Sequence, residues 1–440
     1  MRLEIKNFAK IKEANIIVDG ITVIAGENNT GKSTVGKILF AVFNSLSNVE
    51  DKILEERLKE IENNNRMIIQ NNISDITASR SMISRAALNV ARKISMQIRK
   101  ELNSNETISD EALLSLVENA LKSWCPVTEK DKNDELISAI EQIYNNAKEV
   151  LNLPEETIVL EIVSRYFNRL FHSQIEPLLS GNKLGSEVIL NIKGYEDRLI
   201  FENSRCSKFI DNVKIMHKAI YIDNPFVIDE LSGFGYSATN PMNELLIDLL
   251  TSKAQEGVMD GVIESVRIKE KLKDIYKTLQ SVVHGEILVN QGNDEYYLKN
   301  NELDEPIAFH NLSTGVKAFV ILKMLLEQGC LRDKDVVILD EPEIHLHPQW
   351  QITYAELIVL LQKHFDLSVV VTTHSPYFVD ALNLYSCKYG VDEKVNYYLS
   401  TNSENTATIE CVTGKIDLIY KKMSSTIQVL DTLRHELNNN

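Results

Sequence analysis

The chain has 440 residues, 44% of them hydrophobic and 25% charged, and this composition excludes an intrinsically disordered protein. Its formal net charge of -16 opposes non-specific binding of nucleic acid by the whole molecule, but does not exclude a local basic patch. Five scattered cysteines without a CxxC spacing argue against a disulfide framework or a zinc site. No apolar run reaches about twenty residues and the N-terminus has no signal-peptide core, so we expect a cytoplasmic protein without a membrane segment.

The N-terminal residues predict short strands and then a strand, a turn and a helix. Apolar residues alternate in 1–5 and recur in 16–18 and 21–24, around a turn at Asp19-Gly20. A long stretch without glycine follows, rich in Leu, Ile, Glu, Lys, Asn and Ala. This composition predicts a large helical insertion.

Strand and helix patterns alternate in the rest of the chain. Apolar runs at 187–192, 198–201 and 219–222 predict strands, and leucines at helical spacing predict a helical segment over 242–283. A hairpin is expected near 286–298. The continuous apolar strands at 336–339 and 369–373 are typical of parallel strands covered on both faces.

These patterns predict an α/β fold, a mixed sheet flanked by helices and interrupted by the helical insertion. The expected parts are an N-terminal head segment, the insertion, head strands, a helical segment, a C-terminal head segment and a tail, at residues 1–45, 46–185, 186–225, 226–285, 286–400 and 401–440.

Residues 26–33 match the phosphate-binding pattern G-x-x-x-x-G-K-S between a predicted strand and a predicted helix. Glycines allow successive backbone amides to surround phosphate oxygens at a helix N-terminus. In this pattern the lysine neutralises the outer phosphates and the serine hydroxyl binds Mg²⁺. An ordinary glycine-containing turn is the alternative. We predict a P-loop for ATP and Mg²⁺, formed by Gly26, Asn28, Asn29, Thr30, Gly31, Lys32, Ser33 and Thr34.

Two carboxylates and a histidine follow the two predicted parallel strands. Asp340 and Glu341 come directly after 336–339, at the strand end where open α/β sheets bind ligands. Asp340 is suited to hold the metal through water, beside the Ser33 hydroxyl that binds it, and Glu341 is suited to polarise the attacking water. His374 follows the next strand, where it could sense the γ-phosphate. A solvated acidic turn and a structural histidine are the alternatives.

Two further patterns have weaker chemical meaning. Leu312-Ser313-Thr314-Gly315 precedes an apolar helix, so Ser313 or Thr314 can cap that helix and leave an anion-binding N-terminus. His345 and His347 suggest a metal, but no further ligand is near in sequence, and a role at a subunit contact is favoured.

The order of the P-loop, LSTG, ILDEPE-x-H-x-HP and TTHSP resembles ABC-type ATPases, specifically the heads of the RecF, SMC and overcoming-lysogenization-defect group. The wording GENNTGKS and EIHLHP is similar to the ATPase subunits of bacterial anti-phage defence systems such as Septu and PARIS. The likeness covers roughly residues 1–45 and 305–385. It implies a P-loop NTPase head of the ABC type that hydrolyses ATP.

The resemblance also implies roles for individual residues. Ser313 and Gly315 would contact the γ-phosphate held by Lys32 of an opposite subunit, and His374 would be the switch histidine. Gln70 is a weak candidate for the glutamine of the family's Q-loop. The signature departs from LSGGQ, which makes a transporter less favoured. Only about fifty residues follow the switch region, without a DxD cluster, so we expect this chain to lack the Toprim nuclease domain of the overcoming-lysogenization-defect proteins.

We expect a homodimer or higher homo-oligomer closed around ATP, and a separate, nuclease-like effector that the ATPase gates in anti-phage defence. Arg85, Arg92 and Arg99 are spaced by seven residues, so nucleic acid could bind a basic helix stripe, or the stripe could be a solvated face. A DNA-stimulated repair ATPase and a nucleotide-stabilised scaffold with little hydrolysis are the alternative functions.

Overall fold

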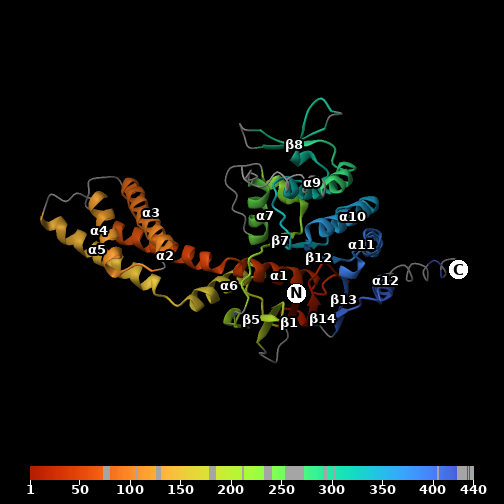
Figure 1. Ribbon diagram of the computed structural model, residues 1–440, viewed down its shortest axis with the longest axis horizontal. Helices are drawn as coiled ribbons and strands as arrows, with labels where there is room; N and C mark the ends of the chain where they lie inside the picture. Colours follow the sequence, from red (N-terminus) through yellow and green to blue (C-terminus); the bar gives the residue numbers. More distant parts are fainter. Residues whose placement is uncertain are drawn as a thin grey trace. The chain divides into compact units, whose positions relative to one another are not determined.

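The computed structural model describes residues 1–72, 80–105, 107–124, 130–177, 185–210, 213–231, 240–252, 272–290, 295–300, 303–403, 406–423, 434 and 436. The chain forms two compact units (Figure 1). Unit 1 contains Met1–Ser47 and Ile162–Asn440, and unit 2 contains Asn48–Glu161. No described helix combines the length and the apolar character needed to cross a bilayer.

Unit 1 is built on a mixed sheet, which confirms the predicted α/β fold class. Within the described residues the sheet has eleven strands. In spatial order they are β6 (Arg205–Ile210), β5 (Tyr195–Glu202), β4 (Ser186–Ile192), β1 (Arg2–Phe8), β2 (Ile11–Ile17), β14 (Thr406–Cys411), β13 (Val395–Ser403), β3 (Ile21–Gly26), β12 (Ser368–Thr373), β11 (Val336–Asp340) and β7 (Ala219–Ile222).

Five neighbouring strands of this sheet, from β13 to β7, run parallel. Their carboxyl ends therefore meet at one edge. The registers align Ala25 with Thr373 and Asp340 with Thr372, so the ends of β3, β12 and β11 are level. This alignment brings together motifs that are more than 300 residues apart in the sequence.

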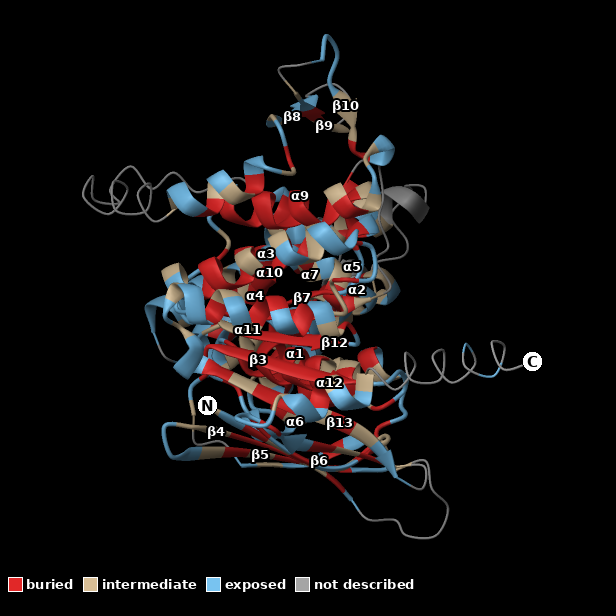
Figure 2. Cartoon of the chain, turned by 90° about the vertical axis from the view of Figure 1, so that its right-hand side faces the viewer, coloured by how far each residue is buried: buried red, intermediate tan, exposed pale blue. Residues whose placement is uncertain are grey.

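Helices cover both faces of the parallel strands. On one face lies α1 (Lys32–Leu46), where Gly36 packs so closely that a Cβ would lie 2.8 Å from Ile338. On the other face, alternate residues such as Val23 and Val371 join one apolar core with α9 (Thr314–Glu327), α10 (Pro348–Phe365) and α11 (Pro376–Tyr389). The buried β3 and β12 and the buried inner side of α9 are visible in Figure 2.

Residues 401–440, expected as a tail, contribute β14 to the interior of the sheet, between β2 and β13. Alternate residues Ala407 and Ile409 are buried, which is the two-residue periodicity of a strand packed on one face. A short helix, α12 (Asp417–Met423), follows. Strand β14 therefore belongs to the same sheet as the N-terminal strands β1 and β2.

A 3₁₀ segment η3 (Asp392–Lys394) lies between α11 and β13, and further described elements of unit 1 lie between β7 and β11. A 3₁₀ segment η1 (Pro225–Leu231) and α7 (Pro241–Thr251) follow β7. The helical segment predicted over 242–283 is described only in part, and residues 253–271 lie outside the described part. The predicted hairpin is confirmed as β8 (Glu286–Asn290) and β9 (Glu295–Lys299), joined by β10 (Ile307–Ala308) and η2 (Phe309–Asn311).

Unit 2 is helical and has its own apolar core. Its helices are α2 (Val49–Asn72), α3 (Arg80–Ser104), α4 (Asp110–Trp124) and α5 (Lys130–Leu151), and α6 (Glu155–Phe171) continues into unit 1. On the predicted basic stripe of α3, Arg92 pairs with Glu62 at 3.2 Å and Arg99 pairs with Glu55, both on α2. These two ion pairs within unit 2 partly neutralise the positive charge of the stripe.

Candidate active site

The loop between β3 and α1 is bent by residues with left-handed backbone. Asn29 has φ +61° and Gly31 has φ +86°. At Gly31 a Cβ would also lie 3.0 Å from the side chain of Ile11, so glycine is required for both conformation and space. Helix α1 then begins with no side-chain cap and no acidic residue in its first turn. Its free amides and its dipole make this end suitable for a phosphate group.

Other parts of unit 1 hold this loop from outside. The Lys10 ammonium donates to the Asn29 carbonyl at 2.7 Å, and the Ser400 hydroxyl donates to the Thr30 carbonyl at 2.6 Å. At Gly26 a Cβ would lie 2.4 Å from the Ser400 carbonyl oxygen. Asn28 is exposed at the outer side of the loop, and Thr34 is half-buried in the first turn of α1. The loop is therefore held in place before any ligand binds.

The Lys32 side chain is only 3% exposed and its ammonium lies over the loop. It donates to the Gly26 carbonyl at 3.0 Å and to the Glu27 carbonyl at 2.8 Å, and its Nζ is 3.4 Å from Glu341 Oε1. A buried ammonium needs such partners, because an unpaired charge in this environment is costly. The positive charge is thus fixed beside the free end of α1.

Ser33 and Asp340 meet across the sheet edge. The Ser33 hydroxyl donates to Asp340 Oδ1 at 3.0 Å, and the Thr372 hydroxyl donates to the same oxygen. Hard oxygen donors at this spacing suit Mg²⁺, whose ligands lie about 2 Å from the ion in an octahedron with edges of about 3 Å. A hydroxyl and a carboxylate beside a phosphate-binding loop therefore fit this ion.

Tyr221, on β7, fixes the second carboxylate oxygen. Its hydroxyl donates to Asp340 Oδ2 at 2.6 Å. Burial, together with the nearby Asp340 charge, raises the pKa of Tyr221 well above its usual value, so the phenol stays a hydrogen-bond donor. Burial also raises the pKa of Asp223, at the end of the same strand, and Asp340 adds to that shift.

Tyr221→Phe is expected to raise the Mg²⁺ concentration needed for half-maximal ATP turnover by about tenfold, because groups that orient a metal ligand typically contribute factors of 10 to 100. A magnesium titration at saturating ATP measures the change. Tyr398→Phe is the matched control, since that hydroxyl accepts from the Ile17 amide at 2.7 Å, away from Asp340. Equal magnesium curves for Tyr221→Phe and the wild type would contradict this role.

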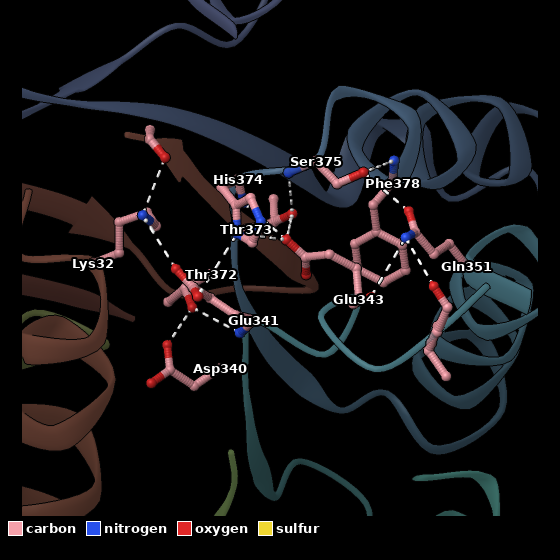
Figure 3. A network of polar contacts seen from close by, with 12 residues as sticks. Lys32, Asp340, Glu341, Glu343, Gln351, Thr372, Thr373, His374, Ser375 and Phe378 are labelled. Carbon is pink, nitrogen blue, oxygen red and sulfur yellow. Dashed lines mark hydrogen bonds and ion pairs between the residues drawn. The ribbon is translucent and has the colours of Figure 1, made fainter. Parts of the chain in front are cut away.

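Glu341 and His374 lie beside the Lys32 ammonium (Figure 3). Glu341 has φ +49°, and its amide donates to the Thr372 carbonyl at 3.0 Å and to the Thr372 hydroxyl at 3.1 Å. This backbone turn directs the carboxylate out of the strand, where Oε2 is 3.7 Å from His374 Nδ1. Both side chains are partly exposed. The arrangement places a carboxylate and a histidine beside the loop that precedes α1.

Ser313 and Gly315 lie at the start of α9, outside this network. Ser313 is the N-cap residue, yet its hydroxyl makes no cap hydrogen bond, and the first turn has no acidic residue. Gly315 packs on Trp350, where a Cβ would lie 2.8 Å from the ring. Lys317 is the fourth residue of α9, and its ammonium pairs with both oxygens of Asp229, at 2.6 and 2.5 Å. The contacts of Gly315 with Trp350 and of Lys317 with Asp229 thus fix the first turn of α9, and its backbone amides remain available for an anion.

The structure therefore brings Lys32, Ser33, Asp340, Glu341 and His374 together, as the motifs predict, and places the signature residues on a separate helix. Sequence reasoning missed Tyr221, Thr372 and Glu343. Thr372 was within the quoted TTHSP motif, but Tyr221 lies on a distant strand whose pattern signals only burial.

The two histidines of the HxH pattern, His345 and His347, make structural contacts. His347 caps α10 by accepting from the Gln349 amide at 3.3 Å, and the His345 ring packs edge-on against Phe226. In the part of the chain that is described, no cluster of three or more His, Cys, Asp or Glu side chains is placed to hold a metal ion, so neither histidine belongs to such a cluster. Gln70 lies in unit 2 and donates to Ser84 at 3.1 Å, so the identity of the Q-loop residue stays open.

Known proteins resemble the chain in sequence and fold. It is 30% identical to Septu protein PtuA of Bacillus thuringiensis over 158 residues, and 29% identical to the Retron Ec83 probable ATPase of Escherichia coli over 178 residues. The matches cover 32% and 34% of the chain, and 33% and 32% of these proteins. The chain thus spans about a third of the curated relatives it matches.

A solved structure of an SMC head bound to the C-winged helix domain of ScpA matches 93% of the chain and 97% of that structure, with 12% identity and a TM-score of 0.45. The family described as "AAA ATPase domain" matches residues 1–379. The resemblance predicted from the motifs is therefore confirmed at the level of the family. The chain belongs to the AAA ATPase domain family.

Proposed function

We propose that the chain binds ATP with Mg²⁺ at the P-loop and hydrolyses it in a dimer closed head to head. The observation that carries this proposal is the Ser33–Asp340 hydrogen bond of 3.0 Å, which joins the P-loop to the end of β11 beside a buried ammonium. A turn with a purely structural role does not require a buried lysine, a hydroxyl and two carboxylates at one edge of the sheet.

Each residue of the site has a role that follows from its position. The free amides of α1 and the Lys32 ammonium bind the phosphate oxygens. Ser33 and Asp340 hold Mg²⁺, which supplies neutralisation of charge on the phosphates. Glu341 accepts a proton from the attacking water, and His374, 3.7 Å away, contacts the outer phosphate.

The signature residues complete the site of a second copy. The Ser313 hydroxyl and the uncapped amides of α9 form an anion-binding end that is not bonded to the P-loop of its own chain. In a two-fold symmetric dimer, each such end can face the P-loop of the partner, so two identical sites form at once. ATP then acts as the connection between the heads.

The biological role we propose is control of a separate effector in anti-phage defence, with a nuclease-like partner. The relatives named Septu protein PtuA and Retron Ec83 probable ATPase support this proposal. They match over about a third of their length, so their partners are proposed for this chain and not transferred to it. Nucleotide-dependent closure of the heads would release or restrain the effector.

Mixing two inactive variants tests the shared site. Lys32→Ala and Ser313→Ala should each turn over ATP slowly alone, because each homodimer has two defective sites. An equimolar mixture should regain about a quarter of the wild-type rate, since half of the dimers have one intact site out of two. The rate of phosphate release measures this recovery. A mixture no more active than the separate variants would contradict the shared site.

A further inference from the structure

Glu343 is a buried carboxylate three residues after Asp340. Its side chain is 2% exposed. It lies on the opposite side of Glu341 from Lys32, next to the end of β12 (Figure 3). Removing a carboxylate from water costs several kcal/mol unless hydrogen bonds compensate. Packing alone therefore does not explain why a carboxylate is buried at this position.

One oxygen of this carboxylate receives contacts from two consecutive residues. Oε1 accepts from the Thr373 hydroxyl at 2.6 Å and from the His374 amide at 2.8 Å, and it lies 3.3 Å from His374 Nδ1. The backbone of His374 is thus hydrogen-bonded to this oxygen, and the ring nitrogen Nδ1 lies within ion-pair distance of it. Oε2 is buried without a hydrogen-bond partner in the described part of the chain.

Neighbouring side chains fix Glu343 in turn. Gln351, in the first turn of α10, donates to the carbonyls of Glu343 and Leu346 at 3.4 and 3.2 Å. It also accepts from the Ser375 hydroxyl at 3.0 Å, and Ser375 caps α11. The segment after β11 and the segment after β12 therefore form one bonded unit around the histidine.

We propose that Glu343 is the positioning residue of His374. It accepts the Nδ1 proton of the imidazole, so that Nε2 faces away from the carboxylate and toward the phosphate-binding side. The inference rests on the proposed role of His374 and adds the residue that orients it. Among the described residues, Glu341 also approaches the ring, with Oε2 3.7 Å from Nδ1, and Lys32 in turn pairs with Glu341.

Burial raises the pKa of the Glu343 carboxyl, while the hydrogen bonds from the Thr373 hydroxyl and the His374 amide oppose that rise. A carboxylate that accepts from the His374 amide and lies 3.3 Å from Nδ1 of the same residue is expected to select the ring tautomer. Glu341, which is more exposed and makes the longer contact, remains available for water.

The first experiment examines the ring without nucleotide. In protein labelled with ¹⁵N-histidine, the His374 signals, identified by their loss in His374→Ala, should show a protonated Nδ1 in the wild type. Glu343→Gln, which keeps the volume and removes the charge, should shift both ring nitrogens toward the other tautomer. Unchanged His374 signals in this variant would overturn the proposal.

The second experiment separates positioning from a merely structural effect. Glu343→Gln should reduce ATP turnover about tenfold or more in the wild-type background, as expected for a misplaced contact group, and should change it little in the His374→Ala background. The same loss in both backgrounds would also overturn the proposal. ATP binding and thermal unfolding confirm that each variant is folded.

Asp335→Asn is the matched control. Asp335 is a buried carboxylate at the opposite end of β11 and bonds a histidine, His217, at 3.1 Å. Its replacement should lower stability and leave both the His374 signals and turnover unchanged. If the wild type shows no ATP turnover, the proposed function fails, yet the nuclear magnetic resonance experiment still decides whether Glu343 orients His374.

Discussion

Replacing Glu341 with Gln is expected to reduce ATP turnover at least a hundredfold, as general-base removal typically does, and to leave ATP bound. The amide keeps the volume of the side chain, and the backbone bonds to Thr372 that direct it outward do not depend on the charge. What is lost is the proton acceptor beside His374. The Lys32 ammonium also loses its ion-pair partner and can interact fully with phosphate, so affinity should not fall.

This variant should accumulate as a dimer in the presence of Mg²⁺ and ATP, because closure is retained and the step that opens it is slowed. Light scattering after size-exclusion chromatography measures the dimer, and single-turnover kinetics measure hydrolysis. Glu356→Gln is the control, since Glu356 holds Lys388 and Tyr389 elsewhere in unit 1. Wild-type turnover by Glu341→Gln would show that another group is the base.

The same measurement separates an enzyme from a nucleotide-stabilised scaffold. If the wild type binds ATP and dimerises but releases phosphate no faster than ATP does without protein, closure alone is the function. A DNA-repair ATPase would instead respond to DNA, with turnover that rises on its addition and a binding constant that falls steeply with salt. The ion pairs of Arg92 and Arg99 within unit 2 do not favour that response.

The local chemistry of the site could be predicted from the sequence because each motif is continuous. Gly31 needs a left-handed conformation, Lys32 and Ser33 follow it directly, and Asp340 ends a strand of apolar residues. Parallel pairing then places all these strand ends at one edge. No knowledge of strand order was needed to expect that Ser33 and Asp340 would meet.

The contacts that depend on strand order could not be predicted in this way. Tyr221 reaches Asp340 because β7 is the neighbour of β11, and the sequence of β7 signals only a buried strand. Likewise β14 pairs with β2, almost 400 residues away in the sequence. A short alternating run near the C-terminus gives no sign of this partner, so the sequence predicts a tail over 401–440. Glu343 lies within the ILDEPE motif, but the sequence gives it no role of its own, and its burial is seen only in the structure.

Lys32→Ala is expected to weaken ATP binding by at least about a hundredfold, the equivalent of about 2.7 kcal/mol. Charge-assisted hydrogen bonds to phosphate contribute about 1.5 to 3 kcal/mol each, and this buried ammonium already donates to two carbonyls of the loop. Isothermal titration calorimetry with Mg²⁺ and a slowly hydrolysed ATP analogue measures the change. Lys6→Ala is the control, because Lys6 is an exposed lysine paired with Glu187.

Part of the loss of ATP affinity in Lys32→Ala should come from repulsion between Glu341 and the phosphates, and the rest from the missing attraction of the ammonium. Without Lys32, the Glu341 carboxylate remains beside the phosphates with its ion-pair partner removed. The double variant Lys32→Ala/Glu341→Gln should therefore bind several-fold more tightly than Lys32→Ala alone, although more weakly than the wild type. Additive effects of the two changes would show that the Lys32–Glu341 pair of 3.4 Å is not coupled when nucleotide binds. A loss below tenfold in Lys32→Ala itself would contradict the assignment of the P-loop as the nucleotide site.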